Sequence, residues 1–101
     1  MARFDLFRLP GDQGYVVDVQ SSHASDKVRT RVVVPLVPVA ELGTPITGLN
    51  PVLRFEGRDY AFVAQSLATL TLPEMGERVG SLMGEYGDQF AYALDILLTG
   101  F

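Results

Sequence analysis

The chain has 101 residues, 48% hydrophobic and 20% charged, which is the composition of a globular protein and not of a disordered one. Its net charge of −4 and scattered basic residues disfavour nucleic acid as a partner and favour a protein. Without cysteine, a signal-peptide core or an apolar run of about 18 residues, we expect one cytoplasmic domain over residues 1–101, with no disulfide and no membrane contact.

The first third of the chain predicts three β-strands. Residues 3–9 form the first strand, which ends at a Pro-Gly-Asp turn signal. Residues 15–20 form the second, in which β-branched side chains dominate. After a polar loop over residues 21–26, residues 28–34 form the third strand, which alternates and then becomes continuously apolar, as when both faces are covered.

Three basic residues cluster around the start of the third strand. Alternation along a strand puts Lys27, Arg29 and Arg31 on one side. They form either a small basic stripe or a solvated strand face. Because the other basic residues are scattered, we expect the solvated face.

Prolines and a hairpin mark the middle of the chain. Prolines 35, 38 and 45 are expected to limit regular strand pairing there. Residues 51–64 predict a hairpin, with a turn over residues 56–59, and residues 67–72 predict a further short strand. Pairing of these strands is therefore expected to be antiparallel.

The last quarter of the chain is expected to be helical. A proline suits the first position of a helical turn, so residues 73–79 predict such a turn. Gly84 and Gly87 are expected to break the chain before a terminal helix that has Asp88 as its N-cap and Gly100 just past its end. A run of antiparallel strands followed by one helix is an α+β fold.

The terminal helix is apolar on more than one face, whereas one apolar stripe suffices for packing on a core. Phe90, Leu94 and Leu97 have i, i+4, i+7 spacing and are predicted to face the core. Tyr92 and Ile96 face elsewhere and are predicted to lie in a dimer interface. The helix tip is predicted to contact a partner.

Known catalytic and metal-binding patterns are missing from the sequence. The single histidine, His23, lies in a polar loop, and neither HExxH nor HxH spacing occurs. No serine lies in a GxSxG motif, and the glycines form neither a dinucleotide-binding nor a phosphate-binding loop. We therefore expect no catalytic residue, no metal and no cofactor.

Three blocks of the sequence follow one another in a defined order and spacing. The first block consists of the segments VDVQS and VVVPL. The second block consists of LNPVL, Gly57, Tyr60 and two later short segments. The third is the apolar terminal helix that ends in Gly100 and one large apolar residue. The short segments cover residues 17–21, 32–36, 49–53, 67–70 and 76–79. Together these blocks resemble the CcdB family of plasmid and chromosomal toxins.

The resemblance implies a fold, a target and an antitoxin. The fold is a five-stranded antiparallel sheet with a smaller sheet and a C-terminal helix, related to SH3-like barrels and shared with MazF/Kid toxins. The implied protein is a homodimer that binds the A subunit of DNA gyrase and traps the enzyme on cleaved DNA. A CcdA-like antitoxin neutralises it, and transcription autoregulation works through that antitoxin, with no direct nucleic-acid binding by the toxin alone.

The resemblance also assigns contact residues by position. The implied gyrase-binding residues are Asp95, Leu98, Thr99, Gly100 and Phe101. The loop after VDVQS is implied to contact antitoxin or gyrase, through Ser22, His23, Ala24 and Ser25. Gyrase poisons of the family typically carry tryptophan before the glycine, and this chain has Thr99 there.

Two alternative functions remain open. One is an endoribonuclease of the MazF/Kid type, which would need a basic groove and a positioned acid/base pair. Only the cluster of basic residues before the third strand hints at such a groove. The other is a non-toxic CcdB homologue that serves as an antitoxin-binding partner, which Thr99 in place of tryptophan favours.

Overall fold

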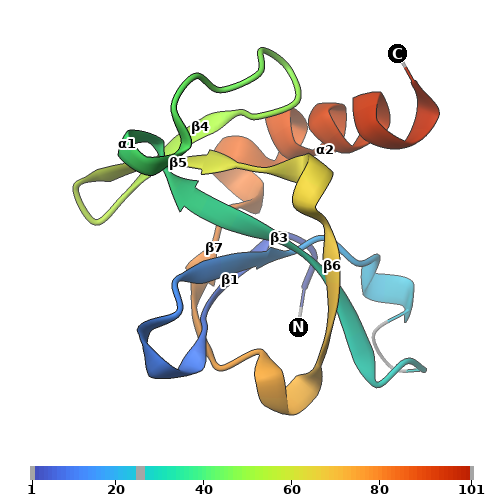
Figure 1. Ribbon diagram of the computed structural model, residues 1–101. Helices are drawn as coiled ribbons and strands as arrows, with labels where there is room; N and C mark the ends of the chain where they lie inside the picture. The colour runs from blue at the N-terminus through green and yellow to red at the C-terminus, as the bar shows by residue number, and fades with distance from the viewer. Residues whose placement is uncertain (1, 25–26, 101) are drawn as a thin grey trace.

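The computed structural model describes residues 2–24 and 27–100 (Figure 1). Within these residues, strands and one long terminal helix are joined by short 3-10 turns. The strands are β1 (Asp5–Arg8), β2 (Tyr15–Asp18), β3 (Thr30–Pro38), β4 (Val52–Phe55), β5 (Arg58–Phe62), β6 (Ala68–Thr71) and β7 (Glu77–Ser81). The helices are α1 (Val39–Leu42) and α2 (Met83–Thr99), and the 3-10 turns are η1 (Pro10–Asp12), η2 (Ser22–Ala24), η3 (Ala64–Ser66) and η4 (Leu72–Glu74).

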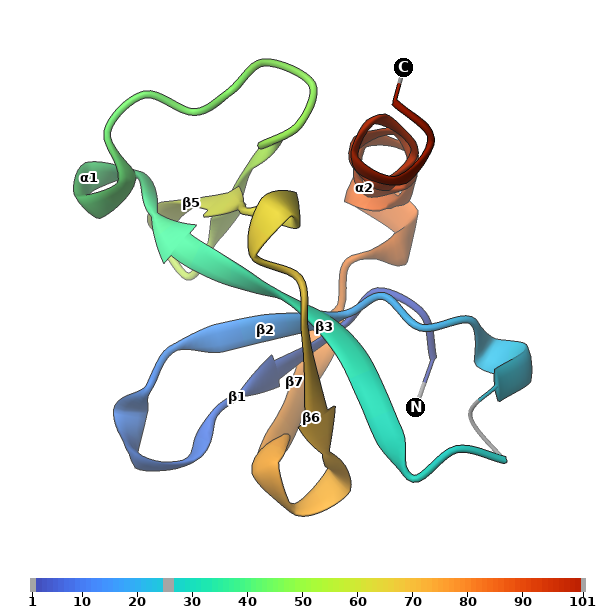
Figure 2. The same cartoon turned by 45° about the vertical axis from the view of Figure 1, so that its right-hand side comes forward.

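The strands form one curled antiparallel sheet with the order β4-β5-β3-β2-β1-β7. Strand β6 pairs with the first half of β3, and β5 pairs with its second half. Strands β7, β1, β2, β3 and β6 therefore curl into a half-barrel, and the β4–β5 hairpin extends from the end of β3 (Figure 2). This arrangement, with α2 packed on the sheet, confirms the predicted α+β fold class. Within the described residues, no helix is long and apolar enough to cross a membrane.

Strand β3 is longer than the sequence predicted, because it runs through Pro35 and ends at Pro38. The expectation that prolines limit pairing was therefore wrong for Pro35, whereas the strand does stop at Pro38 and Pro45 lies outside the strands. The carbonyl of Pro35 accepts a hydrogen bond from the N–H of Val63 at 3.2 Å. The N and O of one strand residue point to the same side, so the missing N–H of Pro35 faces the place where the partner of β3 changes from β6 to β5. No ladder bond is lost there.

The two faces of the sheet cover two separate cores. Leu6 lies in the larger core, between the sheet and α2, whereas its neighbour Phe7 lies in the smaller core inside the half-barrel. This alternation is the two-residue period of a β-strand. Phe4, Phe62 and Phe90 form the centre of the larger core, with ring centroids 5.5 Å apart for Phe4–Phe90 and 4.1 Å apart for Phe62–Phe90. The aromatic stack holds α2 against the sheet.

The segment after β6 differs from the predicted helical turn over residues 73–79. Only η4 is helical, and β7 begins at Glu77. The Glu74 carboxylate accepts hydrogen bonds from the backbone N–H and the hydroxyl of Thr71, at 2.7 and 2.8 Å. These two bonds lower the pKa of Glu74, the backbone bond more than the hydroxyl bond. These bonds form a capping box at the start of η4, and the chain then turns at Gly76 to pair with β1.

Helix α2 begins earlier than the sequence predicted. It starts at Met83, so Gly84 and Gly87 lie inside the helix, and Asp88 is not its N-cap. Gly87 is buried, and a Cβ there would lie 2.9 Å from the Met83 sulfur and 3.7 Å from the Phe4 ring. The close approach of the helix backbone to Phe4, the residue before β1, therefore explains why position 87 is a glycine although it lies inside a helix. The predicted helix end at Gly100 is confirmed.

Candidate functional site

The end of α2 is the first candidate site, and it projects from the sheet at the C-terminus (Figure 1). Leu98 is 70% exposed, and Asp95, Thr99 and Gly100 are also exposed. Four of the five predicted gyrase-binding residues thus share one exposed helical turn, while Phe101 lies outside the described residues. A large apolar side chain with this exposure is available to a partner.

Backbone and side-chain hydrogen bonds shape this helix end. Gly100 is in the left-handed conformation, with φ 81° and ψ 20°, and its N–H donates to the Ile96 carbonyl at 3.1 Å. The Thr99 hydroxyl donates to the Asp95 carbonyl one turn earlier. The side-chain hydroxyl of Thr99 therefore donates its hydrogen within the helix. Its methyl group and oxygen lone pairs remain available to a partner.

Replacing Gly100 with alanine is expected to destabilise the helix end by about 1 kcal/mol, because only glycine adopts this φ without strain. A Cβ at this position would meet nothing within 4 Å, so the cost is conformational and not steric. Thermal unfolding of G100A beside G80A measures it, since Gly80 has neither a positive φ nor a neighbour within 4 Å. Equal unfolding midpoints for the two variants would contradict the left-handed cap.

A second face of α2 carries the two residues predicted for a dimer interface. Tyr92 is 56% exposed and Ile96 is half-buried. Part of their surface is covered within the chain itself, because a Cβ on Gly48 would lie 3.0 Å from Ile96 and 3.5 Å from Tyr92. The loop that precedes β4 therefore packs on this face. A dimer interface remains a prediction for the part of Tyr92 and Ile96 that the loop leaves exposed.

The predicted core face of α2 is confirmed. Phe90 and Leu94 are buried in the larger core, and Leu97 packs against that core.

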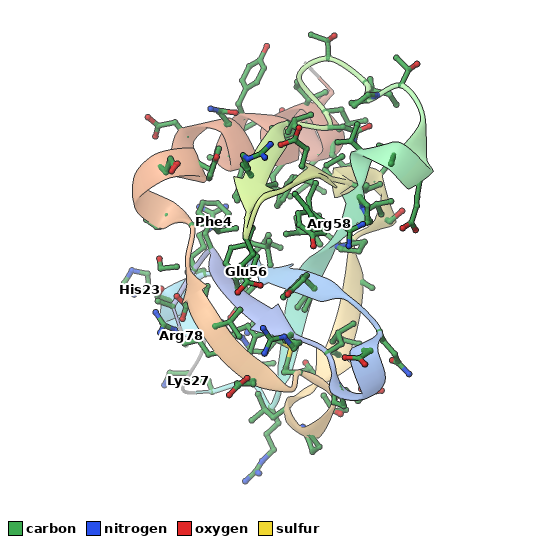
Figure 3. The ribbon with its side chains drawn as sticks, turned by 90° about the vertical axis from the view of Figure 1, so that its left-hand side faces the viewer. Phe4, His23, Lys27, Glu56, Arg58 and Arg78 are labelled. Carbon is green, nitrogen blue, oxygen red and sulfur yellow. The ribbon has the colours of Figure 1, made fainter. Side chains whose placement is uncertain are left out.

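The loop after VDVQS forms the 3-10 turn η2, which lies on the same flank of the molecule as the end of α2 (Figures 1 and 2). Ser22 and His23 are exposed, and His23 lies at the edge of the molecule with its side chain pointing outward (Figure 3). The Ser22 hydroxyl accepts a hydrogen bond from the N–H of Arg3 at 3.4 Å, which ties η2 to the start of the chain. Ala24 ends η2, and Ser25 lies outside the described residues.

The predicted solvated face of three basic residues was wrong at one position. Lys27 and Arg29 are exposed, but Arg31 is buried, with 1% of its surface accessible. Strand β3 begins only at Thr30, and its alternation turns Arg31 into the half-barrel. There its Nε donates to the buried carboxylate of Asp18 at 2.9 Å. Sequence alternation alone could not tell an inward from an outward face.

A cleft of about 440 Å³ is a further candidate site that the sequence did not indicate. It lies between the β1–β2 turn, the end of β3 and the start of β5. The Arg58 guanidinium stands 5.6 Å from the centroid of the Tyr60 ring at its edge. The lining combines aromatic, apolar and charged side chains, including Tyr15, Tyr60, Leu9, Pro38, Asp12, Glu41 and Arg58. These residues come from distant segments, so no local motif marks them.

A cluster of aromatic side chains around Tyr15 forms one wall of this cleft. The Tyr15 ring packs edge-on against Phe55 and Tyr60, with centroids 5.3 and 5.7 Å away. Its hydroxyl donates to the Glu56 carboxylate at 3.3 Å, and Figure 3 shows Glu56 and Arg58 at the β4–β5 turn. The pKa of Arg8 is raised by the Tyr15 hydroxyl first and by nearby carboxylates after it. The wall of the cleft is therefore a rigid aromatic surface with charges of both signs.

Solved structures with a similar fold include endoribonucleases. An endoribonuclease from Mycobacterial species in complex with its cognate antitoxin has a TM-score of 0.78 and 16% identity, covering 98% of this chain and 95% of that chain. The Mycobacterium tuberculosis toxin MazF-mt6 has a TM-score of 0.71 and 10% identity, covering 90% of this chain and 92% of that chain. At these identities the likeness concerns the fold alone. No curated protein matches this chain.

A family model identifies the chain more directly. The model described as CcdB protein matches residues 3–100. This span holds the three sequence blocks up to the glycine at the end of α2, and leaves out only the last residue of the third block, Phe101. The chain therefore belongs to the CcdB family.

Proposed function

We propose that this chain is the toxin of a toxin–antitoxin system, and that it binds the A subunit of DNA gyrase through the end of α2. Bound there, it holds gyrase on cleaved DNA and acts as an inhibitor and not as an enzyme. The observation that carries this proposal is the exposed last turn of α2, with Leu98 70% exposed, in a member of the CcdB family. An apolar helix end kept in water is a property of a partner site.

The charge of α2 supports a protein partner with a basic surface. The helix carries Glu85, Asp88 and Asp95, all exposed, and the last basic residue of the chain is Arg78, before the helix begins. Complementary charge speeds association and selects against wrong partners. In a homodimer the two helix ends would be related by a twofold axis, which suits a twofold target. A CcdA-like antitoxin that covers this surface would neutralise the toxin.

The position before the terminal glycine gives a direct test. Replacing Thr99 with tryptophan is expected to tighten binding to a gyrase A fragment at least about tenfold, because an aromatic anchor can contribute about 2 kcal/mol at a buried contact. Deleting residues 99–101 is expected to weaken it by a similar factor. Calorimetric titration of both variants measures the change, and Thr44→Trp, at an exposed loop position, serves as the matched control.

Three results would refute parts of this proposal. If the intact protein neither binds gyrase nor accumulates cleaved complexes, gyrase is not its target. If the deletion binds as well as the intact chain, the end of α2 is not the contact surface. If overexpression leaves a gyrase-sensitive host growing normally, the chain is a non-toxic homologue that serves as an antitoxin-binding partner.

An endoribonuclease is the second candidate, because the structural neighbours include proteins of that name. The burial of Arg31 against Asp18 removes one of three basic residues that a groove would have used. The cleft beside Arg58 also carries Asp12 and Glu41, which repel phosphates. Incubation with single-stranded RNA separates the candidates, since cleavage would favour the endoribonuclease.

A further inference from the structure

A buried ion pair lies inside the half-barrel at the end from which η2 leaves. Asp18 is fully buried, and Arg31 is 1% exposed. The Nε and Nη2 atoms of Arg31 both donate to one oxygen of Asp18, Oδ2. The pair joins the last residue of β2 to the second residue of β3.

The second oxygen of Asp18 extends this pair toward η2. Its Oδ1 accepts from the backbone N–H of Gln20 at 3.0 Å, two residues before η2 begins. The side-chain oxygen of Gln20 accepts in turn from the N–H of Val32 at 3.1 Å. The N–H of Val19 donates to the carbonyl of Val32 at 3.0 Å. The chain on both sides of η2 is therefore held by one polar network of Asp18, Gln20 and Arg31.

Stability alone does not account for this network. Burying two charges costs about as much free energy as their attraction returns, and apolar replacements of similar volume are often neutral or stabilising. The side-chain nitrogen of Gln20 is also buried, and it has no hydrogen-bond partner within the described residues. An unpaired buried donor lowers stability further. What the network does provide is a fixed direction for the chain as it enters η2.

We propose that Asp18 and Arg31 are positioning residues that hold η2 in the conformation in which it contacts a protein partner. This rests on the proposed function for the identity of the partner but not for the effect on η2 itself. The exposed Ser22 and His23 follow Gln20 directly, so a change in the direction of Gln20 moves both. Without the network, η2 would sample several conformations, and binding would select one of them at a cost in affinity.

The test replaces the ion pair by apolar side chains of similar volume, as Asp18→Leu with Arg31→Met. Loss of the ion pair itself is expected to be nearly neutral for stability. Loss of the Asp18 acceptor for the Gln20 N–H is expected to lower the unfolding midpoint, so exchange and binding are compared well below that midpoint. Hydrogen exchange of the Arg3 and His23 amides, which donate to the hydroxyls of Ser22 and Ser21, is expected to become about tenfold faster. The dissociation constant for the gyrase A fragment is expected to rise about tenfold. The matched control is Arg54→Met with Asp59→Leu, which removes an exposed ion pair on the β4–β5 hairpin. It should change neither the exchange rates at η2 nor the dissociation constant for the gyrase A fragment.

Exchange and binding separate the two proposals. Unchanged exchange at the Arg3 and His23 amides in the folded double variant would overturn the positioning role. Faster exchange supports it even if the unmodified chain does not bind gyrase, in which case only the gyrase assignment fails. If the double variant does not fold, Arg31→Lys keeps the paired charges and the Asp18 acceptor for Gln20, and it removes the planar guanidinium whose Nε and Nη2 both bind Asp18 Oδ2. We then expect exchange to rise about threefold, and no rise would overturn the proposal.

Discussion

Replacing Gly76 with alanine is expected to lower the free energy of unfolding by more than about 4 kcal/mol, a loss that few single substitutions reach. Gly76 has φ +76°, and a Cβ there would lie 2.1 Å from the backbone oxygen of Arg8. That oxygen cannot retreat easily, because Arg8 pairs with Glu77 in the β1–β7 ladder. The alanine must therefore break the start of this ladder or strain it.

A matched substitution separates the clash from the backbone strain. Gly57 has φ +79°, nearly the same as Gly76, but a Cβ on it would meet nothing within 4 Å. Gly57→Ala should therefore cost only the left-handed conformation, about 1–2 kcal/mol. Denaturant unfolding of both variants gives the difference between them. Equal midpoints with equal slopes would show that the β7 edge moves away without cost, and would contradict the predicted clash.

Strands with turn signals on both sides were predictable from the sequence. The turn signal after β1, the β-branched residues of β2 and the hairpin around Gly57 each report a local preference that the fold keeps. The core face of α2 was predictable for the same reason, since the spacing of Phe90 and Leu94 already defines an apolar stripe. Local and tertiary preferences agree at these positions.

The errors lie where a tertiary contact overrides a local preference. Gly87 resembles a helix break until the packing of Phe4 and Met83 on it is known. Pro35 resembles the end of a strand until the change of partner along β3 is known. Arg31 resembles a surface residue until Asp18 is seen opposite it inside the half-barrel. A single sequence contains no signal for any of these contacts.

The candidate site was predicted in part for the same reasons. The exposure of Leu98, Thr99 and Gly100 follows from a helix end, and local sequence places that end correctly. The placement of η2 and the cleft beside Arg58 depend on how distant strands meet, which local sequence does not determine. The sequence did not predict the polar network that holds η2, because Asp18 and Arg31 resemble ordinary surface residues.

Replacing Phe90 with alanine is expected to lower the free energy of unfolding by about 3–5 kcal/mol, the range for truncating a buried aromatic residue. Phe90 is fully buried and stacks on Phe62, with the ring planes 7° apart. Its ring also meets Phe4 edge-on and lies 5.9 Å from the ring of Tyr86. Alanine would leave a cavity among three other rings. Gln89→Ala, at an exposed position of the same helix, is the control and should change stability by less than about 1 kcal/mol.

Comparison of Phe90→Ala with Leu98→Ala shows whether stability and partner binding depend on different parts of α2. Phe90→Ala should weaken gyrase binding only through the fraction of unfolded chain, so its affinity corrected for that fraction should match the unmodified protein. Leu98→Ala should lower the affinity for gyrase and leave the free energy of unfolding nearly unchanged, because Leu98 is 70% exposed and contributes little to the core. Calorimetric titration well below the unfolding midpoint measures both effects. A loss of corrected affinity in Phe90→Ala equal to that in Leu98→Ala would mean that the whole helix must be held rigid for binding. The last turn alone would then not be the site.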